Sequence, residues 1–258
     1  MAARIRFMRF IPIKIRPLLP PKDNIYPVLD KYLPKLRDGD ILVITSKILA
    51  IHQGRCVRAK NWDKRALAMR EADYYLPQKK TQKNPSFLTI KGHAIISSAG
   101  IDSKNGNGYY VLSPHNPSQA AKVICQYLKR EYYLTKLAVI ITVSHSIPLR
   151  HGTVGISLGF FGLEPLKSYT GKPGVFGRRL KFAWANLVDG LAATATIVMG
   201  EADEQTPLVI VRGAGFVTFT NQARHQQLFT KPAQDIYAPL LTAFRSKNLT
   251  ERKKTSKT

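Results

Sequence analysis

The chain carries several short apolar runs that are rich in β-branched residues and are separated by polar turns. Three nearly continuous runs, Ile41–Thr45, Leu137–Val143 and Leu208–Arg212, predict strands that are buried on both faces. Weaker signals predict three more strands, over residues 5–15, Phe87–Ile90 and Ala94–Ser97. The apolar positions therefore predict at least one sheet with a buried centre.

Other segments place apolar residues three and four positions apart, as an amphipathic helix does. Helices are predicted over Asn24–Leu36, Lys64–Tyr75, Ser118–Tyr132 and Leu180–Met199, with Asp23 as the N-cap of the first. Strands and helices are mixed without the regular alternation of a doubly wound sheet. This order predicts an α+β fold in which mixed sheets pack against helices.

Length and composition narrow the class of protein. With 258 residues, 44% of them hydrophobic, the chain has enough apolar mass for a sizeable core. One domain is predicted over residues 1–244, built as one unit or as two intertwined subdomains, and a basic flexible tail over residues 245–258. No apolar run reaches the roughly 20 residues of a membrane span. The two cysteines cannot form a disulfide framework and fit a reducing cytoplasm.

The net charge is unusually high. Forty Lys and Arg residues against 16 Asp and Glu residues give +24, and the basic residues are spread over the whole chain. Such a surface attracts nucleic acid, anionic lipid or polyanionic substrates. A generally basic surface is the simpler interpretation. Nucleic-acid binding stays as a rival function, disfavoured because no nucleic-acid-binding motif is present.

The loop Ala99–Gly106 places Asp102 between the end of a predicted strand and a glycine turn. A carboxylate there suits Mg²⁺, which typically takes one or two carboxylates together with substrate phosphates. The alternative is an Asx turn, in which Asp102 and Asn105 bind their own backbone. Both interpretations are compatible with the residues alone.

The segment Thr142–Gly152 follows the strongest predicted strand and combines Ser144, His145 and Arg150. Hydroxyl, imidazole and guanidinium groups at a strand end are typical of an anion site. A Ser–His nucleophile pair is the weaker interpretation, because no nucleophile-elbow spacing surrounds it.

Two further polar segments flank the longest predicted helix. Lys172–Arg179 is a basic turn with glycines, whose amides could hold phosphate, or else a solvated surface loop. Gly200–Glu204 holds three of the sixteen acids and is either a metal or amine site or an ordinary acidic turn. The chain has no GxxxxGK(S/T) loop, no GxGxxG and no HExxH motif, which disfavours ordinary NTPases, dinucleotide enzymes and zinc proteases.

Seven motifs between about Ile41 and Arg212 occur in an order that is specific as a set. They are Thr45–Ile48 with Gly54–Arg55, Glu71–Pro77, Ala99–Leu112, Pro148–Arg150 with Gly152, Gly171–Pro173 with Phe176–Arg178, Asp189–Ala193, and Met199–Glu201 with Glu204–Pro207. With these motifs the chain resembles the coenzyme F-420-0:gamma-glutamyl ligase (CofE-like) family. It is especially similar to the bacterial subgroup described as folate-metabolism gamma-glutamate ligases.

The resemblance implies the fold of that family and a nucleotide-dependent ligase activity. In this family GTP phosphorylates a substrate carboxylate with Mg²⁺ or Mn²⁺, and the amine of L-glutamate then displaces phosphate to form an amide. ATP is an alternative nucleotide, the acceptor is a carboxylate-bearing cofactor or metabolite, and a homodimer is expected. The implied site residues are Asp102, Ser144 and Glu201 for the metal, Ser46, Lys47, Arg55, Asn105 and Arg178 for the nucleotide, and Arg150 and Lys104 for catalysis.

Three positions depart from the family pattern. Val143 stands where the family has a metal-ligating Asp, Gln53 where it has Glu, and Lys104 where it has Ser. Two acids are lost and one base is gained near the expected nucleotide, so Lys104 would replace one metal ion as a point charge. The alternative is a catalytically reduced protein of the same fold that binds a nucleotide or another anion.

Overall fold

The computed structural model describes residues 7–77, 87–104 and 106–246 of the chain. Its strands are β1 (Arg9–Ile13), β2 (Asp40–Thr45), β3 (Cys56–Arg58), β4 (Tyr74–Tyr75), β5 (Leu88–Lys91), β6 (Ala94–Ser97), β7 (Tyr109–Val111), β8 (Leu137–His145), β9 (Val154–Phe161), β10 (Leu166–Ser168), β11 (Trp184–Asn186), β12 (Leu208–Arg212) and β13 (Arg245–Ser246). The α-helices are α1 (Ile25–Tyr32), α2 (Ser46–His52), α3 (Lys64–Glu71), α4 (Pro117–Glu131), α5 (Leu187–Met199), α6 (His225–Leu228) and α7 (Ala238–Leu241). This mixture confirms the predicted α+β class.

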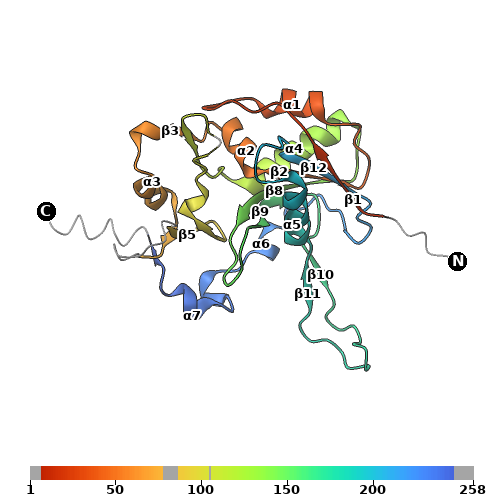
Figure 1. The fold of residues 1–258 in the computed structure, drawn as a ribbon. Helices are drawn as coiled ribbons and strands as arrows, with labels where there is room; N and C mark the ends of the chain where they lie inside the picture. The colour runs from red at the N-terminus through yellow and green to blue at the C-terminus, as the bar shows by residue number, and fades with distance from the viewer. Residues whose placement is uncertain (1–6, 78–86, 105, 247–258) are drawn as a thin grey trace.

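A five-stranded sheet forms the centre of the molecule, in the order β1–β12–β2–β8–β9 (Figure 1). β2 and β8 are parallel, whereas the other neighbouring pairs are antiparallel. The three inner strands, β12, β2 and β8, are the three continuous apolar runs of the sequence. A strand that has a neighbour on each edge and a packed layer on each face needs apolar residues throughout.

Alternate residues of the inner strands face two separate apolar layers. Leu42 and Ile44 belong to the core that is packed under α1, α2 and α4. Ile41 and Val43 belong to the second core, which lies under α5. This two-residue period is that of a strand. Because both faces are covered, the sheet is a rigid base for the loops at its edges.

A smaller antiparallel sheet, in the order β13–β4–β5–β6, lies beside the central one. α3 packs against it through a third apolar cluster that includes Leu67, Phe87 and Ile101. Together with the short β3–β7 pair, this cluster holds the segment that leads to Asp102. The smaller sheet therefore supplies a second wall opposite the central sheet.

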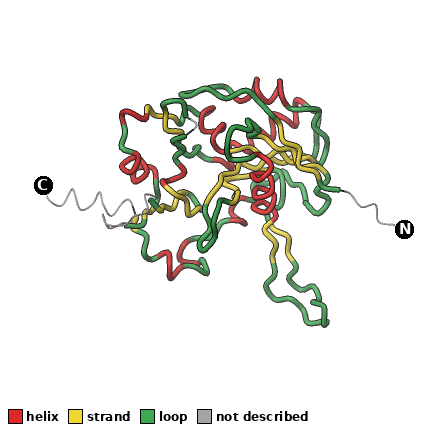
Figure 2. Tube along the Cα trace, viewed as in Figure 1, coloured by secondary structure: helices red, strands yellow, loops and turns green. Residues whose placement is uncertain are grey.

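The hairpin of β10 and β11 projects away from both sheets, as Figures 1 and 2 show. Beyond the two short strands it is mostly loop (Figure 2). We call residues 166–186 the arm. Three apolar side chains on it are almost fully exposed: Val175 (95%), Phe176 (98%) and Phe182 (92%).

All six predicted strands and all four predicted helices occur, but several bounds differ. α1 ends at Tyr32, and Asn24 caps it in place of Asp23, whose carboxylate is held by Arg16. α3 ends at Glu71, because the following Tyr74–Tyr75 pairs with β5 as strand β4.

The largest correction concerns the helix predicted over Leu180–Met199. α5 begins only at Leu187, where the side chain of Asn186 accepts a hydrogen bond from the amide of Asp189 at 3.0 Å. The preceding Trp184–Asn186 pairs with β10 instead. The prediction was wrong because it followed the apolar composition of the segment and overlooked Asn186, the N-cap at which the strand ends and the helix begins.

The ends of the chain and its cysteines can be compared with the expectations in part. Arg245–Ser246 pairs with β4, so the first two residues of the predicted tail are a strand, and residues 247–258 lie outside the described ones. Cys56 and Cys125 are both free. Among the described residues, no helix has the length and hydropathy to cross a membrane.

Candidate functional site

A cavity of about 700 Å³ lies where the central sheet meets the smaller sheet. Its first wall is one edge of the central sheet. The parallel strands β2 and β8 end at this edge, and β12, which is antiparallel to β2, begins there. Residues 45–48, 142–146 and 200–207, which leave or enter these strands, all line the cavity. Carboxyl ends of parallel strands commonly form ligand crevices in this way. We call this space the main cavity.

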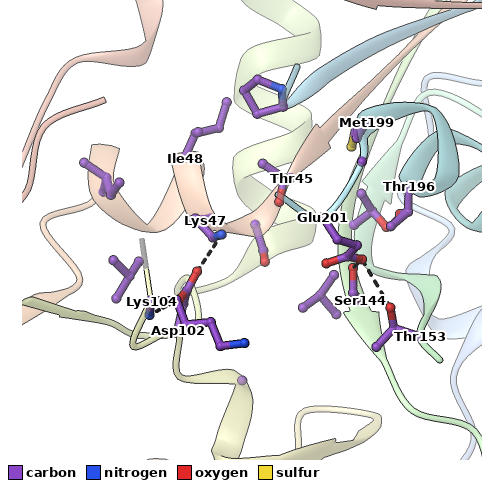
Figure 3. A pocket seen from close by; sticks show the side chains of 18 of the residues that line it. Thr45, Lys47, Ile48, Asp102, Lys104, Ser144, Thr153, Thr196, Met199 and Glu201 are labelled. Atoms are coloured by element: carbon purple, nitrogen blue, oxygen red, sulfur yellow. Dashed lines mark hydrogen bonds and ion pairs between the residues drawn. The ribbon is translucent and has the colours of Figure 1, made fainter. Parts of the chain in front are cut away.

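The opposite wall carries Asp102, which is fixed by both its backbone and its side chain. Its amide and carbonyl form a two-way bridge with Val111 at 2.9 and 3.0 Å. One carboxylate oxygen accepts from the amide of Lys104 at 2.7 Å, and the other pairs with Lys47 at 2.5 Å (Figure 3). Asp102 therefore forms the Asx turn and also lines the main cavity, and its role as a metal ligand stays a prediction.

The turn before Asp102 has an unusual backbone. Ser98, Ala99 and Gly100 have positive φ values of 50°, 53° and 74° in succession. The hydroxyl of Thr89 accepts from the amide of Ala99 at 2.8 Å, and that of Ser113 donates to its carbonyl at 2.7 Å. Backbone held in this region costs energy and persists only where the surroundings enforce it. The turn thus fixes where the Asp102 segment enters the cavity.

Across the cavity from Asp102, Glu201 accepts hydrogen bonds from two hydroxyls (Figure 3). One comes from Ser144 at the end of β8 and the other from Thr153 at 3.3 Å. Gly200 precedes Glu201 with a φ of +77°, and a Cβ there would lie 2.2 Å from the carboxyl carbon of Glu204. Ser144 is bonded to a carboxylate rather than to an imidazole, so this contact does not support the Ser–His nucleophile pair.

Charges of both signs gather around the main cavity. Four carboxylates line it, a quarter of the sixteen in the chain: Asp102, Glu201, Asp203 and Glu204. Four cations also line it: Arg16, Lys47, Lys64 and Lys104. Since the chain carries so few acids, this concentration distinguishes the cavity from the generally basic surface. Such a site suits a ligand that brings phosphates together with a cation.

Six of the ten predicted site residues line the main cavity: Ser46, Lys47, Asp102, Lys104, Ser144 and Glu201. Arg55 does not, because its guanidinium pairs with Glu71 and donates to the carbonyl of Ser113. Arg150 is exposed in the loop after β8, and Arg178 is exposed on the arm. The basic turn Lys172–Arg179 therefore does not lead into a helix as predicted. Asn105 lies outside the described residues.

The structure also brings in residues that the sequence did not indicate. Arg16 follows β1 and lines the cavity, with its guanidinium hydrogen-bonded to Asp23 at 2.5 and 3.1 Å. Lys64, the first residue of α3, donates to the hydroxyl of Ser103 at 3.0 Å. In the sequence, the only indication of a site at Arg16 was its position after a strand, and at Lys64 its position at the start of a helix. His145, which the sequence had placed in a candidate anion site, also lines the cavity. Its Nδ1 is buried, and among the described residues that atom has no hydrogen-bond partner.

The donor atoms fit a hard divalent cation in part. Asp102, Glu201 and Ser144 offer oxygens, the atoms that Mg²⁺ and Mn²⁺ prefer. Within the described ranges, however, no group of three or more His, Cys, Asp or Glu side chains is arranged to hold a metal ion. A divalent ion bound here would therefore take further ligands from a substrate such as a nucleotide phosphate.

Comparison with known proteins identifies relatives over most of the chain. A family model described as F420-0:Gamma-glutamyl ligase matches residues 13–213. Relatives named coenzyme F420:L-glutamate ligase include one from Methanopyrus kandleri, 27% identical over 252 residues (89% of this chain, 97% of the relative). The relative from Methanocaldococcus jannaschii is 30% identical over 231 residues (78% and 86%). That from Methanothermobacter thermautotrophicus is 33% identical over 199 residues (69% and 76%).

These matches assign the chain to a class of ligases. More specifically, it belongs to the F420-0:gamma-glutamyl ligase family, as the ordered motifs predicted. Six of the residues implied by those motifs meet in the main cavity, although they come from four separate segments of the chain.

Proposed function

We propose that the chain is a nucleotide- and metal-dependent ligase that adds L-glutamate to a carboxylate-bearing acceptor through an acyl-phosphate. The observation that carries the proposal is the main cavity, with a lysine–aspartate pair that joins its two walls and a carboxylate–hydroxyl pair on the wall of the central sheet. The names of the relatives, coenzyme F420:L-glutamate ligases, support it. GTP is the proposed nucleotide, with ATP as the alternative, and a precursor of coenzyme F420 is one candidate acceptor.

The proposed reaction has two steps. An oxygen of the acceptor carboxylate attacks the γ-phosphorus, the bond to the β–γ bridging oxygen breaks, and the nucleoside diphosphate leaves. The neutral amine of L-glutamate then attacks the acyl carbon, phosphate leaves, and the amine gives up a proton. The first step spreads negative charge over the transferred group, so it needs fixed cations close by.

The lysines of the main cavity are proposed to neutralise that charge. The Lys47–Asp102 pair is partly exposed, with side chains 34% and 21% accessible, and such pairs contribute little to stability. Lys47 is therefore able to leave Asp102 for a phosphate at small cost. Asp102, Ser144 and Glu201 would then hold Mg²⁺ or Mn²⁺, which neutralises phosphate charge when it is bound. Roles for Arg150, Arg178 and Asn105 stay predictions.

The first test is thermal unfolding with a panel of GTP, ATP and other nucleotides, each with and without Mn²⁺. A ligand that binds only the folded chain raises the unfolding temperature. We expect GTP with Mn²⁺ to give the largest rise and Asp102→Ala to abolish its Mn²⁺-dependent part. Glu131→Ala, which removes an exposed acid at the end of α4, is the matched control and should behave as wild type.

The second test measures nucleoside diphosphate release with candidate acceptors, with and without L-glutamate. Release that needs both the acceptor and L-glutamate supports the ligase. Nucleotide binding without any such release would favour the catalytically reduced binding protein instead. Absence of a thermal shift with every nucleotide would contradict the ligase and leave the alternative only as a protein that binds another anion.

A further inference from the structure

A second cavity, of about 530 Å³, lies on another part of the molecule. It is bordered by residues 91–94 around the β5–β6 turn, residues 113–119 before and at the start of α4, residues 157, 158, 160 and 161 of β9, and the α6 region. Its volume lies within the roughly 300–1,000 Å³ that is usual for small-molecule sites. Ile96 lines both cavities, whereas none of the six predicted site residues of the main cavity lines this one.

Histidines gather in this cavity. Three of the six histidines of the chain line it: His93, His115 and His225. We therefore call it the histidine cavity. Lysines are common along the whole chain, but histidines are not. The clustering of histidines therefore distinguishes this cavity from the generally basic surface. An imidazole both donates hydrogen bonds and takes a proton near neutral pH, which suits a bound anion.

The other charged groups of the histidine cavity are Lys91, Lys122 and Asp73. The carboxylate of Asp73 accepts from the amide of Gly92 at 2.6 Å, so it is engaged in the β5–β6 turn. Lys91 donates to the carbonyl of Glu71, and Lys122 lies over the ring of Phe161 at 5.9 Å. The lining of the cavity thus includes two lysines and three imidazoles but a single carboxylate. Hydrogen-bond donors therefore outnumber negatively charged groups.

Backbone amides add donors at the start of α4. Asn116 has a left-handed backbone (φ 41°) and its side chain does not cap the helix, and Pro117 has no amide hydrogen. The amides of Ser118 and Gln119 donate to no atom of the described residues, and both residues line the histidine cavity. An exposed helix start does not make a site by itself. Here it adds to an independent cluster of imidazoles, and such amides favour phosphate oxygens.

Aromatic rings cover another side of the cavity. His93 stacks on Phe229 with ring centroids 4.4 Å apart and an angle of 7° between the planes. Phe160 and Phe161 of β9 also border the cavity, but their rings are buried in the two cores (2% and 5% exposed), so the apolar contact comes from the stacked His93–Phe229 pair. A ligand that only carried charge would leave the accessible part of this stacked pair in contact with water. The wall therefore fits a flat ring attached to the anionic group.

We propose that the histidine cavity binds a small molecule in which a phosphate is attached to a flat ring. The phosphate lies among His115, His225 and the amides of Ser118 and Gln119, and the ring lies against the stacked pair of His93 and Phe229. This binding does not depend on the ligase reaction proposed for the main cavity.

The test uses phenyl phosphate as the probe, with inorganic phosphate and phenol as its two halves. Titration calorimetry and the imidazole resonances in NMR spectra follow binding. We expect phenyl phosphate to bind more tightly than either half and to shift the resonances of His93, His115 and His225. The double variant His115→Gln/His225→Gln should bind it at least about tenfold more weakly, because it loses two hydrogen bonds to a charged group. His151→Gln, which changes an exposed histidine outside both cavities, is the matched control.

Two further variants separate the possible outcomes. If the double variant unfolds at a lower temperature than wild type, Lys122→Gln replaces it as the test of the cavity. Lys47→Gln weakens phosphate binding in the main cavity only, so it should leave the phenyl phosphate affinity unchanged. The proposal is wrong if wild type does not bind phenyl phosphate. It is also wrong if binding is lost in Lys47→Gln and kept in the histidine or Lys122 variants.

Discussion

Val143 is the residue whose identity most changes the chemistry of the main cavity. It lies near the end of β8, lines the cavity, and precedes Ser144, which donates to Glu201. Val143→Asp would place a second carboxylate near Glu201, and two carboxylates repel unless a cation lies between them. We expect the variant to lose about 1–3 kcal/mol of stability without metal and to gain Mn²⁺ affinity in a calorimetric titration with GTP.

The matched control for that prediction is Val143→Asn, which has a similar shape and no charge. A stronger form combines Val143→Asp with Lys104→Ser, since Lys104 lines the same cavity and competes for the place of the cation. If neither aspartate variant binds Mn²⁺ more tightly than Val143→Asn, position 143 is not a ligand position in this chain.

Asp23 is predicted to control stability in acid. The hydrogen bond from Arg16 lowers the pKa of Asp23 from 3.8 to about 2. Because the folded pKa is below the unfolded one, the contribution is complete above about pH 4 and disappears as the pH falls towards 2. Asp23→Asn should therefore reduce the free energy of unfolding at pH 7 by about 1 kcal/mol, after allowance for solvent screening. Urea unfolding between pH 7 and pH 3 measures this, and a difference from wild type that stays constant with pH would contradict it.

Single residues also show where sequence motifs stop being informative. The turn at Asp102 was predicted because it is a local feature, whereas its place in the main cavity depends on segments that are distant in sequence. Arg55 and Gln53 were misjudged because their partners are distant in sequence. Arg55 pairs with Glu71, and the amide of Gln53 both donates to and accepts from the backbone of His115 at 2.9 and 2.7 Å. A glutamate at position 53 could not donate, so this departure from the family does not remove an acid from the main cavity.

At the scale of elements, the contact between β9 and α5 depends on glycine. A Cβ on Gly155 would lie 2.1 Å from the hydroxyl of Thr196 and 2.6 Å from the carbonyl of Ala192. The carbonyl is backbone and cannot turn away, so the strand and helix would have to separate. We expect Gly155→Ala to destabilise the fold by about 1–3 kcal/mol, measured as the shift of the urea midpoint at constant slope.

Gly190 provides the control for this prediction within the same pair of elements. It lies in α5, and a Cβ there would meet nothing within 4 Å. Gly190→Ala should therefore stabilise the helix by up to about 1 kcal/mol, since alanine has the higher helix propensity. If both variants shift the midpoint in the same direction, close packing at Gly155 is not the cause.

Glycines also explain why the sequence did not predict strand β9. β9 forms an edge of the central sheet, yet its sequence, VGISLGFF, contains Gly155 and Gly159 and lacks a strong β-branched run. Glycine weakens a strand signal, and here it is needed because β9 touches α5 at Gly155 and the start of α4 at Gly159. The inner strands were predicted because burial on both faces requires a continuous run of apolar residues. An edge strand such as β9, which needs glycine where it touches helices, has no such run.

At the scale of the whole molecule, the net charge says less about the site than the positions of the few acidic residues do. A net charge of +24 indicated only a basic surface, and it did not locate a site. The acids are more informative, because four of sixteen line one cavity although they come from two segments of the chain. Their convergence depends on the parallel pairing of β2 with β8 and on the second sheet, neither of which follows from the local pattern.

The arm offers the clearest test of the expected homodimer. Val175, Phe176 and Phe182 are each more than 90% exposed on it, and apolar patches of this kind usually mark an interface. We expect the wild-type chain to be a dimer by light scattering and Phe176→Ser/Phe182→Ser to dissociate at least about tenfold more readily, since buried aromatic residues dominate interface energies. The unfolding temperature of the variant at low protein concentration should match that of wild type, because neither ring packs in the core of its own chain.

Ile236→Ser, an equally conservative loss of an exposed apolar side chain away from the arm (87% exposed), is the control and should keep the dimer. A monomeric wild-type chain, or a dimer that both variants preserve, would show that the arm does not join two copies.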